Sequence, residues 1–267
     1  MGRFAGFLLH HIIRFKRKPV INNLNIVYGE GKWPDGILKK IYRHMGLLFC
    51  EMLRMPSLGG EKYIDRFSLH GIENLDDALA QGKGVIIVSA HTGNWEYGIS
   101  GLNLKGYKAN VIVKNLKDID NDYVFNQIRG KKGVGSILKD KGTVLNVRRA
   151  LKRNEIVVMV IDQNSKRSEG VFVDHFGKPA STYLAPYVLS NRFGCPIVPV
   201  FNYRDENLKD HHIICYPAIK LEPSGDDQKD QIANTEAYIK AFEKFLMDHP
   251  EQWIWMHRRW RSQPKEE

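Results

Sequence analysis

A histidine and a glutamate follow a short apolar run in this chain, and together they could activate a hydroxyl group. His91 and Glu96 come directly after the run 85–89 and a turn of small residues. An imidazole can accept a proton near neutral pH, and a neighbouring carboxylate can hold its tautomer and stabilise the imidazolium. Buried strands deliver residues to an active-site rim at their carboxyl ends, so this placement predicts general-base chemistry.

The spacing of the two residues restricts where each can lie. Five residues separate side chains by about 140° on a regular helix, so His91 and Glu96 would not share a helix face. We therefore expect His91 in the turn before a helix and Glu96 in the first turns of that helix, reaching back. A helix amino terminus would also attract a developing oxyanion. The alternative interpretation is two unrelated surface residues.

A second polar pair, Asp162 and Gln163, ends another apolar run at 156–161. If both runs are parallel strands, Asp162 and His91 could open on one cleft at the carboxyl edge of the sheet. In the alternative interpretation Asp162 only caps the next turn.

The elements that must position these residues alternate along the chain. Strands are expected at 66–70, 85–89, 110–113, 156–161, 196–201 and 212–215. Helices are expected at 37–55, 72–81, from within 92–95 to about 102, and at 120–128, 143–151, 185–192 and 230–248. This alternation predicts a single-domain α/β sandwich around a largely parallel or mixed sheet. The length of 267 residues and the absence of a linker pattern also favour one domain.

Composition and charge indicate a reduced, basic globular protein. Three cysteines without paired or metal-type spacing favour a cytosol-facing chain. The formal net charge is +10, and residues 1–60 hold ten Lys or Arg against three Asp or Glu. Such segments bind phosphate on nucleic acid or on an anionic membrane. No nucleic-acid module accompanies them, so we expect no nucleic-acid partner.

The amino-terminal residues 1–20 are expected to form a short amphipathic or truncated membrane-anchor segment, with the main domain over 21–267. The apolar run 4–13 is too short to span a bilayer, which needs roughly 20 apolar residues. A basic cluster at 14–18 follows it, as in helices that lie in the membrane interface. A terminal helix packed on the core is the alternative.

Several segments resemble one family in order. The pair His91–Glu96 resembles the H-x-x-x-x-[DE] motif of the glycerolipid acyltransferase superfamily, and the chain more closely resembles the bacterial lipid A biosynthesis acyltransferases. The supporting segments are Asn23-Leu24 with Tyr28-Gly29-Glu30, His70-Gly71-Ile72-Glu73-Asn74-Leu75, Asp162-Gln163 with Gly170-Val171-Phe172-Val173 and Phe176-Gly177-Lys178-Pro179-Ala180, and Pro250-Glu251-Gln252-Trp253-Ile254-Trp255-Met256-His257-Arg258-Arg259-Trp260. Tyr-Gly replaces the family's usual Phe-Pro before Glu30, and the apolar amino-terminal segment is shorter than usual.

The resemblance implies a glycerol-3-phosphate acyltransferase-like fold and roles for individual residues. His91 would be the general base, Glu96 its orienting partner, and no covalent acyl-enzyme would form; no G-x-S-x-G elbow is present. Arg129 could stabilise the oxyanion, bind an acceptor phosphate, or be a solvated helix residue. The candidate substrate-binding residues are Asn94, Arg129, Asp162, Gln163, Phe172, Phe176 and Gly177. The last three could line an acyl-chain slot or pack in a core strand. The mixture of cations and an aromatic at 258–261 fits a lipid headgroup.

The predicted function is O-acyl transfer from an acyl thioester to a hydroxyl of a lipid A precursor or similar glycolipid. An acidic acyl carrier protein suits this basic chain better than coenzyme A as donor. Its docking candidates are Lys114, Lys117, Lys131, Lys132, Arg148 and Arg149. The adjacent histidines at 10–11 and 211–212 lack a third ligand, so neither metal nor cofactor is expected. The predicted location is the cytoplasmic face of the bacterial inner membrane, peripheral or anchored by the amino-terminal segment.

Rival functions remain open at this point. One is the same chemistry on a phosphatidylinositol mannoside, an aminolipid or a pigment. Another is a hydrolase in which the His–Glu pair activates water. A third is a basic membrane- or nucleic-acid-binding protein without catalysis.

Overall fold

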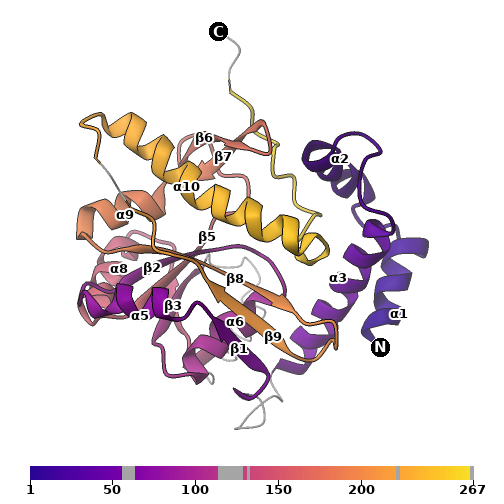
Figure 1. Ribbon diagram of the computed structural model, residues 1–267, viewed down its shortest axis with the longest axis horizontal. Coiled ribbons are helices and arrows are strands. Elements are labelled where there is room, and N and C mark those ends of the chain that lie inside the picture. Colours follow the sequence, from indigo (N-terminus) through magenta and orange to yellow (C-terminus); the bar gives the residue numbers. More distant parts are fainter. Residues whose placement is uncertain (56–63, 114–128, 131–132, 221–222, 265–267) are drawn as a thin grey trace.

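A seven-stranded sheet forms the centre of the molecule (Figure 1). The computed structural model describes residues 1–55, 64–113, 129–130, 133–220 and 223–264. The strands are β1 (Phe67–His70), β2 (Val85–Ser89), β3 (Ala109–Val113), β4 (Gly135–Leu138), β5 (Ile156–Val160), β8 (Ile197–Arg204) and β9 (His211–Cys215). Their order is β1-β9-β8-β2-β5-β3-β4, and all neighbours are parallel except β8 and β9. The predicted α/β architecture around a largely parallel sheet is therefore confirmed.

Helices cover both faces of this sheet (Figure 1). In β2, Val85 and Ile87 belong to the core cluster that contains α5 (Glu73–Ala80) and α6 (Trp95–Leu104). Ile86 and Val88 point the other way, into the cluster that contains α8 (Thr143–Lys152), α9 (Ala185–Phe193) and α10 (Asp227–Asp248). Burial on both faces explains why β2 and β5 consist mostly of β-branched apolar residues.

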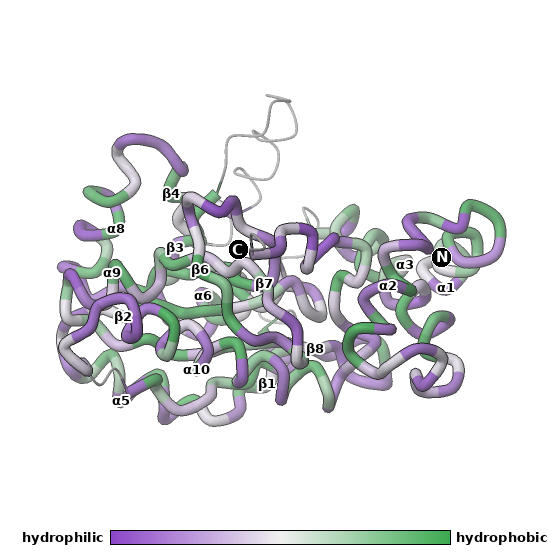
Figure 2. Tube along the Cα trace, turned by 90° about the horizontal axis from the view of Figure 1, so that it is seen from above, coloured by the Kyte–Doolittle hydropathy of each residue, from purple (hydrophilic) through white to green (hydrophobic). Residues whose placement is uncertain are grey.

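The amino-terminal helices form a unit at one end of the molecule (Figures 1 and 2). They are α1 (Gly2–Phe7), a π-helix (Leu8–Ile12), α2 (Arg17–Tyr28) and α3 (Ile37–Arg54). The amide of Asn23 donates to the carbonyls of Trp255 and His257, at 2.8 and 2.7 Å, and so ties α2 to the carboxyl-terminal segment. The proposed boundary after residue 20 lies inside α2, and the division remains a prediction. Among the described helices, none is long and apolar enough to cross a membrane.

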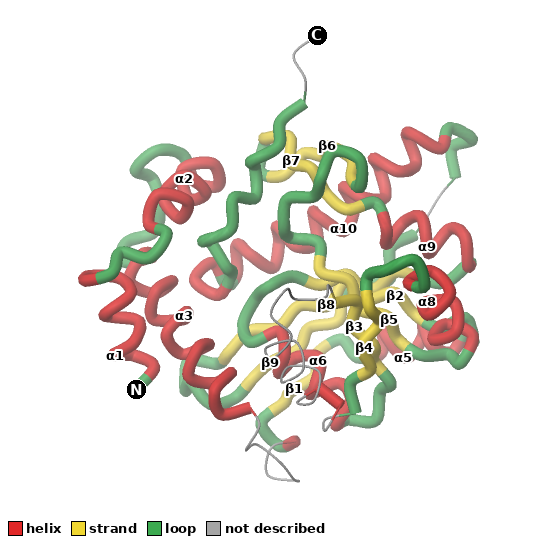
Figure 3. Tube along the Cα trace, turned by 180° about the vertical axis from the view of Figure 1, so that it is seen from behind, coloured by secondary structure: helices red, strands yellow, loops and turns green. Residues whose placement is uncertain are grey.

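An antiparallel hairpin lies outside the main sheet (Figure 3). It consists of β6 (Gly170–His175) and β7 (Lys178–Tyr183), joined by a two-residue turn in which Phe176 and Gly177 both have positive φ, at +54° and +73°. Such a turn matches the twist of the two strands. The backbone N–H of Phe176 donates to Glu243 of α10 at 2.7 Å, so the hairpin packs on that helix.

Most predicted elements agree with these bounds. No element was predicted for β4, β6, β7, α2 or the 3-10 helix Pro250–Gln252. The predicted helix 120–128 lies outside the described residues.

Candidate active site

His91 lies in the turn between β2 and α6, as its spacing from Glu96 predicts. Gly93 in this turn has φ +53°, and a Cβ there would lie 2.6 Å from the carbonyl oxygen of Asn202, so only glycine fits without movement. Asn94 then caps α6, because its side-chain oxygen accepts from the N–H of Tyr97 at 3.1 Å. Glu96 follows in the first turn of the helix.

The carboxyl-terminal segment braces the same turn. Ile254 donates its N–H to the carbonyl of His91 at 3.1 Å, and Gly93 donates to the carbonyl of Gln252 at 2.9 Å. These hydrogen bonds fix the backbone of His91 and of the turn that carries it.

The carboxylate that contacts the imidazole is Asp162, which follows β5. Nδ1 of His91 lies 2.8 Å from Oδ1 of Asp162. Because β2 and β5 are parallel neighbours in which Ser89 pairs with Val160, the two side chains emerge at the same edge of the sheet. The expectation that Glu96 reaches back to orient the ring needs correction, because Asp162 accepts the hydrogen bond of Nδ1 instead. This contact leaves Nε2 as the nitrogen that can accept a proton.

Burial and charge set the protonation of this pair. Asp162 is 1% exposed, and the indole of Trp253 donates to its second oxygen at 2.8 Å. Burial opposes ionisation, but the charge and hydrogen bond of His91, together with Trp253, lower the pKa of Asp162 to about 2. For His91, burial likewise opposes charge, yet the carboxylates of Asp162 and Glu96 raise its pKa above 6.5. The imidazole is thus a stronger base than a free one.

Glu96 is engaged by Arg129. The guanidinium donates to both carboxylate oxygens, and one of the two bonds measures 2.9 Å from Nε to Oε2. Both side chains are largely buried, with exposures of 13% for Arg129 and 6% for Glu96. A bidentate pair of this kind fixes both planes, so Glu96 acts on His91 through its charge while its oxygens hold Arg129.

Other predicted substrate-binding residues are placed in different ways. The side-chain amide of Gln163 lies 3.4 and 3.5 Å from Nδ1 and Nε2 of His91, so it borders the imidazole. Asn94 is buried, and its side chain is used to cap α6 and to donate to Glu51 at 2.9 Å. Phe172 lies in β6, and Phe176 and Gly177 form the hairpin turn. Their contact with an acyl chain remains a prediction.

Trp95, which packs against the imidazole, also lines a small cavity. Trp95 packs edge-on against His91, with ring centroids 4.9 Å apart, and it also lines a cavity of about 20 Å³ between α6 and the sheet. Gly98, Ile99 and Val200 are among the other lining residues. At this volume the cavity cannot hold a fatty acyl chain.

The structure corrects the expectation for the cluster at 258–261. Arg259 is fully buried and donates to the carbonyl of Ser181 at 2.6 Å and to the hydroxyl of Thr182. Trp260 is buried as well, and only Arg258 and Arg261 are exposed. The central part of this segment therefore fastens the carboxyl-terminal segment to β7 and does not face a lipid headgroup.

Sequence reasoning missed the residues that support the site from a distance. Glu51 of α3 binds the amide of Asn94, and Arg204 of β8 donates to Glu51 at 2.7 Å. Arg204 also lies 2.9 Å from Nδ1 of His44. Because Glu51 lies 43 residues before Asn94, no local pattern could have revealed this network.

The sheet edge of this α/β protein therefore holds a histidine–aspartate pair suited to proton transfer and, beside it, a buried arginine–glutamate pair. A model of the bacterial lipid A biosynthesis acyltransferases matches residues 1–262. The chain belongs to this family and is an acyltransferase, as the sequence motifs predicted.

Curated relatives match nearly the whole chain. The lipid A biosynthesis lauroyltransferase of Escherichia coli is 27% identical over 99% of this chain and 85% of its own length. The lipid A biosynthesis palmitoleoyltransferase of the same organism is 26% identical over the same shares. The phosphatidylinositol mannoside acyltransferase of Mycobacterium tuberculosis is 26% identical over 85% of this chain and 71% of its own.

Proposed function

We propose that this protein transfers a fatty acyl chain from an acyl thioester to a hydroxyl of a lipid A precursor or a similar glycolipid. The observation that carries the proposal is the 2.8 Å contact between His91 and Asp162 at the sheet edge, in a chain of this family. A neutral imidazole whose Nδ1–H is held by an ionised aspartate presents Nε2 as a base.

The reaction proceeds by direct attack. Nε2 of His91 takes the proton of the acceptor hydroxyl while the oxygen of that hydroxyl attacks the thioester carbonyl carbon. The tetrahedral intermediate then collapses, the carbon–sulfur bond breaks, and the thiolate leaves with the proton that His91 returns. The ester and the free thiol are the products, and no acyl group is attached to the protein. Asp162 stabilises the imidazolium while it holds the proton.

The negative charge on the carbonyl oxygen needs a positive counterpart. The amino-terminal end of α6 begins at Trp95, four residues after His91, and supplies a positive dipole end. Arg129, which Glu96 of the same helix turn holds in place, offers its guanidinium as a donor to the carbonyl oxygen. We propose that Glu96 holds the guanidinium of Arg129 beside the reacting carbonyl.

The acceptor and the donor follow from the relatives and from charge. The names of the lipid A enzymes support a lipid A precursor as the acceptor, and the mycobacterial relative supports a phosphatidylinositol mannoside as the second candidate. The net charge of +10 favours an acidic acyl carrier protein over coenzyme A as donor. Arg148 and Arg149 are exposed on α8, and Arg148 lines an open depression of about 660 Å³ with Lys141 and Arg192. The other four docking candidates lie outside the described residues.

The site of action is the cytoplasmic face of the inner membrane, where the chain associates peripherally or through its amino-terminal unit. The basic amino-terminal sequence and a lipid acceptor support this location.

The deciding experiment combines the purified protein with an acyl thioester and the two glycolipids and follows the products by mass spectrometry. We expect one of the glycolipids to gain one acyl chain. His91→Ala should lower the rate roughly 10³-fold, while its circular dichroism spectrum shows that the fold is retained. Retained turnover in this variant would refute the assignment of the base.

Two further readouts separate the rival functions. The intact mass of protein quenched during turnover should carry no acyl group, and a stable acyl adduct would contradict direct transfer. Free fatty acid formed without any acceptor would indicate a hydrolase. Vesicle binding without any reaction of the thioester would indicate a binding protein without catalysis.

The donor preference is tested by charge reversal. Arg148→Glu with Arg149→Glu should raise KM for the acyl carrier protein substrate and leave KM for acyl-CoA unchanged. The wild-type KM for the carrier should rise with salt, because salt screens the docking charges.

A further inference from the structure

The amino-terminal unit is built around a close contact of glycines. Gly2 and Gly6 of α1 pack against Gly46 of α3: a Cβ added at Gly46 would lie 2.3 Å from the carbonyl oxygen of Gly2, and one at Gly6 2.6 Å from that of Tyr42. Small residues four apart that let two helix backbones touch are typical of helix pairs in membranes. The contact uses the glycines and leaves the larger side chains of α1 outside it.

Seven large apolar side chains of α1, of the residues that follow it and of α3 are exposed, and we refer to them as the apolar surface of this unit. Between 42% and 67% of each is accessible, although ordinary soluble surfaces expose such residues only singly. The group consists of Phe4, Phe7, Ile12, Ile13, Phe15, Phe49 and Leu53. Figure 2 shows green, apolar segments at this end of the molecule, opposite the end that carries α8 and α9.

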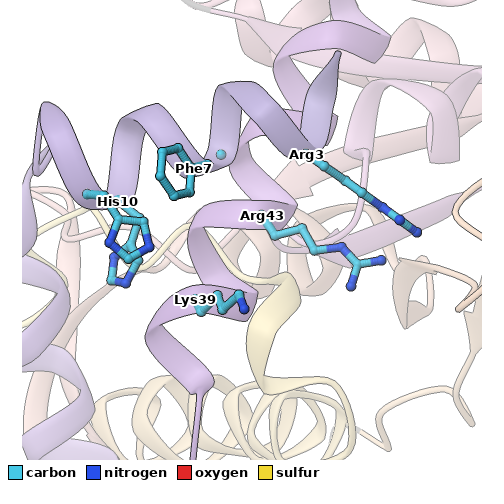
Figure 4. A pocket seen from close by; sticks show the side chains of 7 residues that line it. Arg3, Phe7, His10, Lys39 and Arg43 are labelled. Atoms are coloured by element: carbon cyan, nitrogen blue, oxygen red, sulfur yellow. The ribbon is translucent and has the colours of Figure 1, made fainter.

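A cationic groove lies between α1 and α3, beside this surface (Figure 4). Its volume is about 290 Å³, and its charged lining residues are Arg3, Lys39 and Arg43. Within the described part of the chain, no carboxylate lies within ion-pair distance of these three cations. In Figure 4 the side chains of Arg3 and Arg43 extend in the same direction.

Two of the residues that line the groove also carry buried polar atoms. Nδ1 of His10 and Nε of Arg43 are shielded from solvent and have no hydrogen-bond partner among the described residues. Burial, together with the charges of His11, Arg17 and Lys39, lowers the pKa of His10, so the groove is a positive environment in which a further positive charge is unfavourable. An anion in the groove could accept hydrogen bonds from the guanidinium groups of Arg3 and Arg43.

We propose that this groove binds the phosphate of an anionic phospholipid, so that the face formed by α1 and α3 lies on an anionic membrane. The apolar side chains named above would enter the headgroup and acyl boundary, as in interfacial helices. The apolar rim favours a phospholipid over a soluble phosphate or an acidic protein, because only a lipid supplies an apolar partner next to the anion. The inference deepens the proposed function by specifying the membrane contact.

The same helix connects this face to the active site. Glu51 lies on α3 between the exposed residues Phe49 and Leu53, and its carboxylate accepts from Asn94, the cap of α6. The backbone carbonyl of Glu51 also accepts from the hydroxyl of Tyr97 at 3.0 Å. Docking of α3 on a bilayer would therefore set the orientation of His91 and Glu96 relative to the lipid surface.

The test measures binding of the full chain to vesicles by co-sedimentation, with phosphatidylcholine alone and with added phosphatidylglycerol. The variant Arg3→Ala, Lys39→Ala, Arg43→Ala should bind anionic vesicles roughly 100-fold more weakly, at about fivefold per cation. The matched control is Lys83→Ala, Lys105→Ala, Lys152→Ala, which removes the same charge from exposed positions outside the unit. This control should bind nearly as the wild type does.

A second variant separates the apolar contribution. Phe4→Ser with Ile13→Ser changes only exposed residues, so folding should be preserved, and it should weaken binding to both vesicle types without changing the salt dependence. Circular dichroism checks each variant. The proposal is overturned if the two triple variants bind anionic vesicles equally, or if the groove variant loses only affinity for acyl carrier protein.

The outcome is independent of catalysis. All binding measurements are repeated with His91→Ala, which leaves the groove intact. Vesicle binding that follows the predicted pattern without any acyl transfer would support the groove and refute the proposed function. Acyl transfer in detergent with no effect of the groove variant on vesicle binding would do the reverse.

Discussion

Two histidine–carboxylate pairs among the described residues, His91–Asp162 and His175–Glu243, are both hydrogen-bonded, but they differ in the exposure of the ring and in the direction of its pKa shift. His91 contacts Asp162 at 2.8 Å and keeps 20% of its side chain exposed. His175 contacts Glu243 at 3.2 Å and is completely buried. Its ring stacks on Trp260, with centroids 5.1 Å apart and planes within 16°. The first ring can meet a substrate, and the second cannot.

The direction of the pKa shifts follows from this difference. The carboxylates around His91 outweigh burial and raise its pKa, whereas burial dominates at His175 and lowers its pKa to about 4. A histidine beside a carboxylate is thus a base only where its other nitrogen remains accessible. At His175 the same pair joins β6 to α10 and belongs to the core.

The largest expected effect concerns the carboxylates. Asp162→Asn should lower kcat/KM roughly 10²- to 10³-fold, because an amide N–H facing Nδ1 would move the ring proton to Nε2 and abolish the base. Glu243→Gln should change kcat/KM less than about threefold, because the hydrogen bonds of Glu243 go to His175, Phe176 and Lys240 and not to His91. The two variants are compared by steady-state kinetics at pH 7, and their melting temperatures are measured to check that both are folded. Similar losses in both variants would mean that the pairs do not differ in function.

The next effect is on stability and has opposite signs for the two histidines. His175 is neutral in the fold down to about pH 4, whereas an unfolded histidine binds a proton below about 6.5. The unfolded state therefore binds more protons between these values, and stability falls as pH falls. Over this interval the loss amounts to about 3 kcal/mol. His91, with a raised pKa, contributes stability below pH 6.5 that is lost as pH rises through its folded value.

Urea unfolding at several pH values checks both signs. The unfolding free energy of the wild type, relative to that of His175→Phe, should decrease as pH falls from 6.5 to 4. The difference for His91→Ala should run the other way, with the wild type losing its advantage above pH 6.5. Parallel curves for the two variants would remove the distinction between the pairs.

A third carboxylate sharpens the comparison. Glu96 affects His91 by charge and holds Arg129 by two hydrogen bonds. If its main task is to place Arg129, Glu96→Gln and Arg129→Gln should each reduce kcat/KM, and the double variant should lose about tenfold less than the product of the two losses. Strictly multiplicative losses in this double-mutant cycle would show that the two residues act separately.

The sequence predicted the strand–turn–helix around His91 because the information is local. An unbroken β-branched run, a glycine and an asparagine cap specify β2, the turn and the start of α6. The carboxyl edge of a parallel sheet also brought His91 and Asp162 into one prediction. The sequence did not reveal which carboxylate contacts the ring. Asp162 is 71 residues from His91 along the chain, whereas Glu96 is only five residues away and was the more obvious candidate.

Other features depended on contacts that no pattern records. The hairpin β6–β7 places Phe176 in a positive-φ turn, a position where asparagine or glycine would have signalled a turn. Arg259 resembles a surface cation in the sequence, but β7 supplies the oxygens that hold it inside. Glu51, which supports the cap of α6, is identified only by its distance to Asn94.

The smallest expected effect is a shift of the pH profile. It reports the effect of the Asp162 charge on the pKa of His91, separately from the orientation of the ring. Transfer requires neutral His91, so kcat/KM of the wild type should fall as pH drops through a pKa above 6.5. Asp162→Asn removes the main charge that raises this pKa, so the acidic limb of its residual activity should move to lower pH. Glu243→Gln should leave the limb in place, since Glu243 pairs with the core histidine. A limb that stays fixed in Asp162→Asn would mean that another group titrates, and the base would then have to be sought elsewhere.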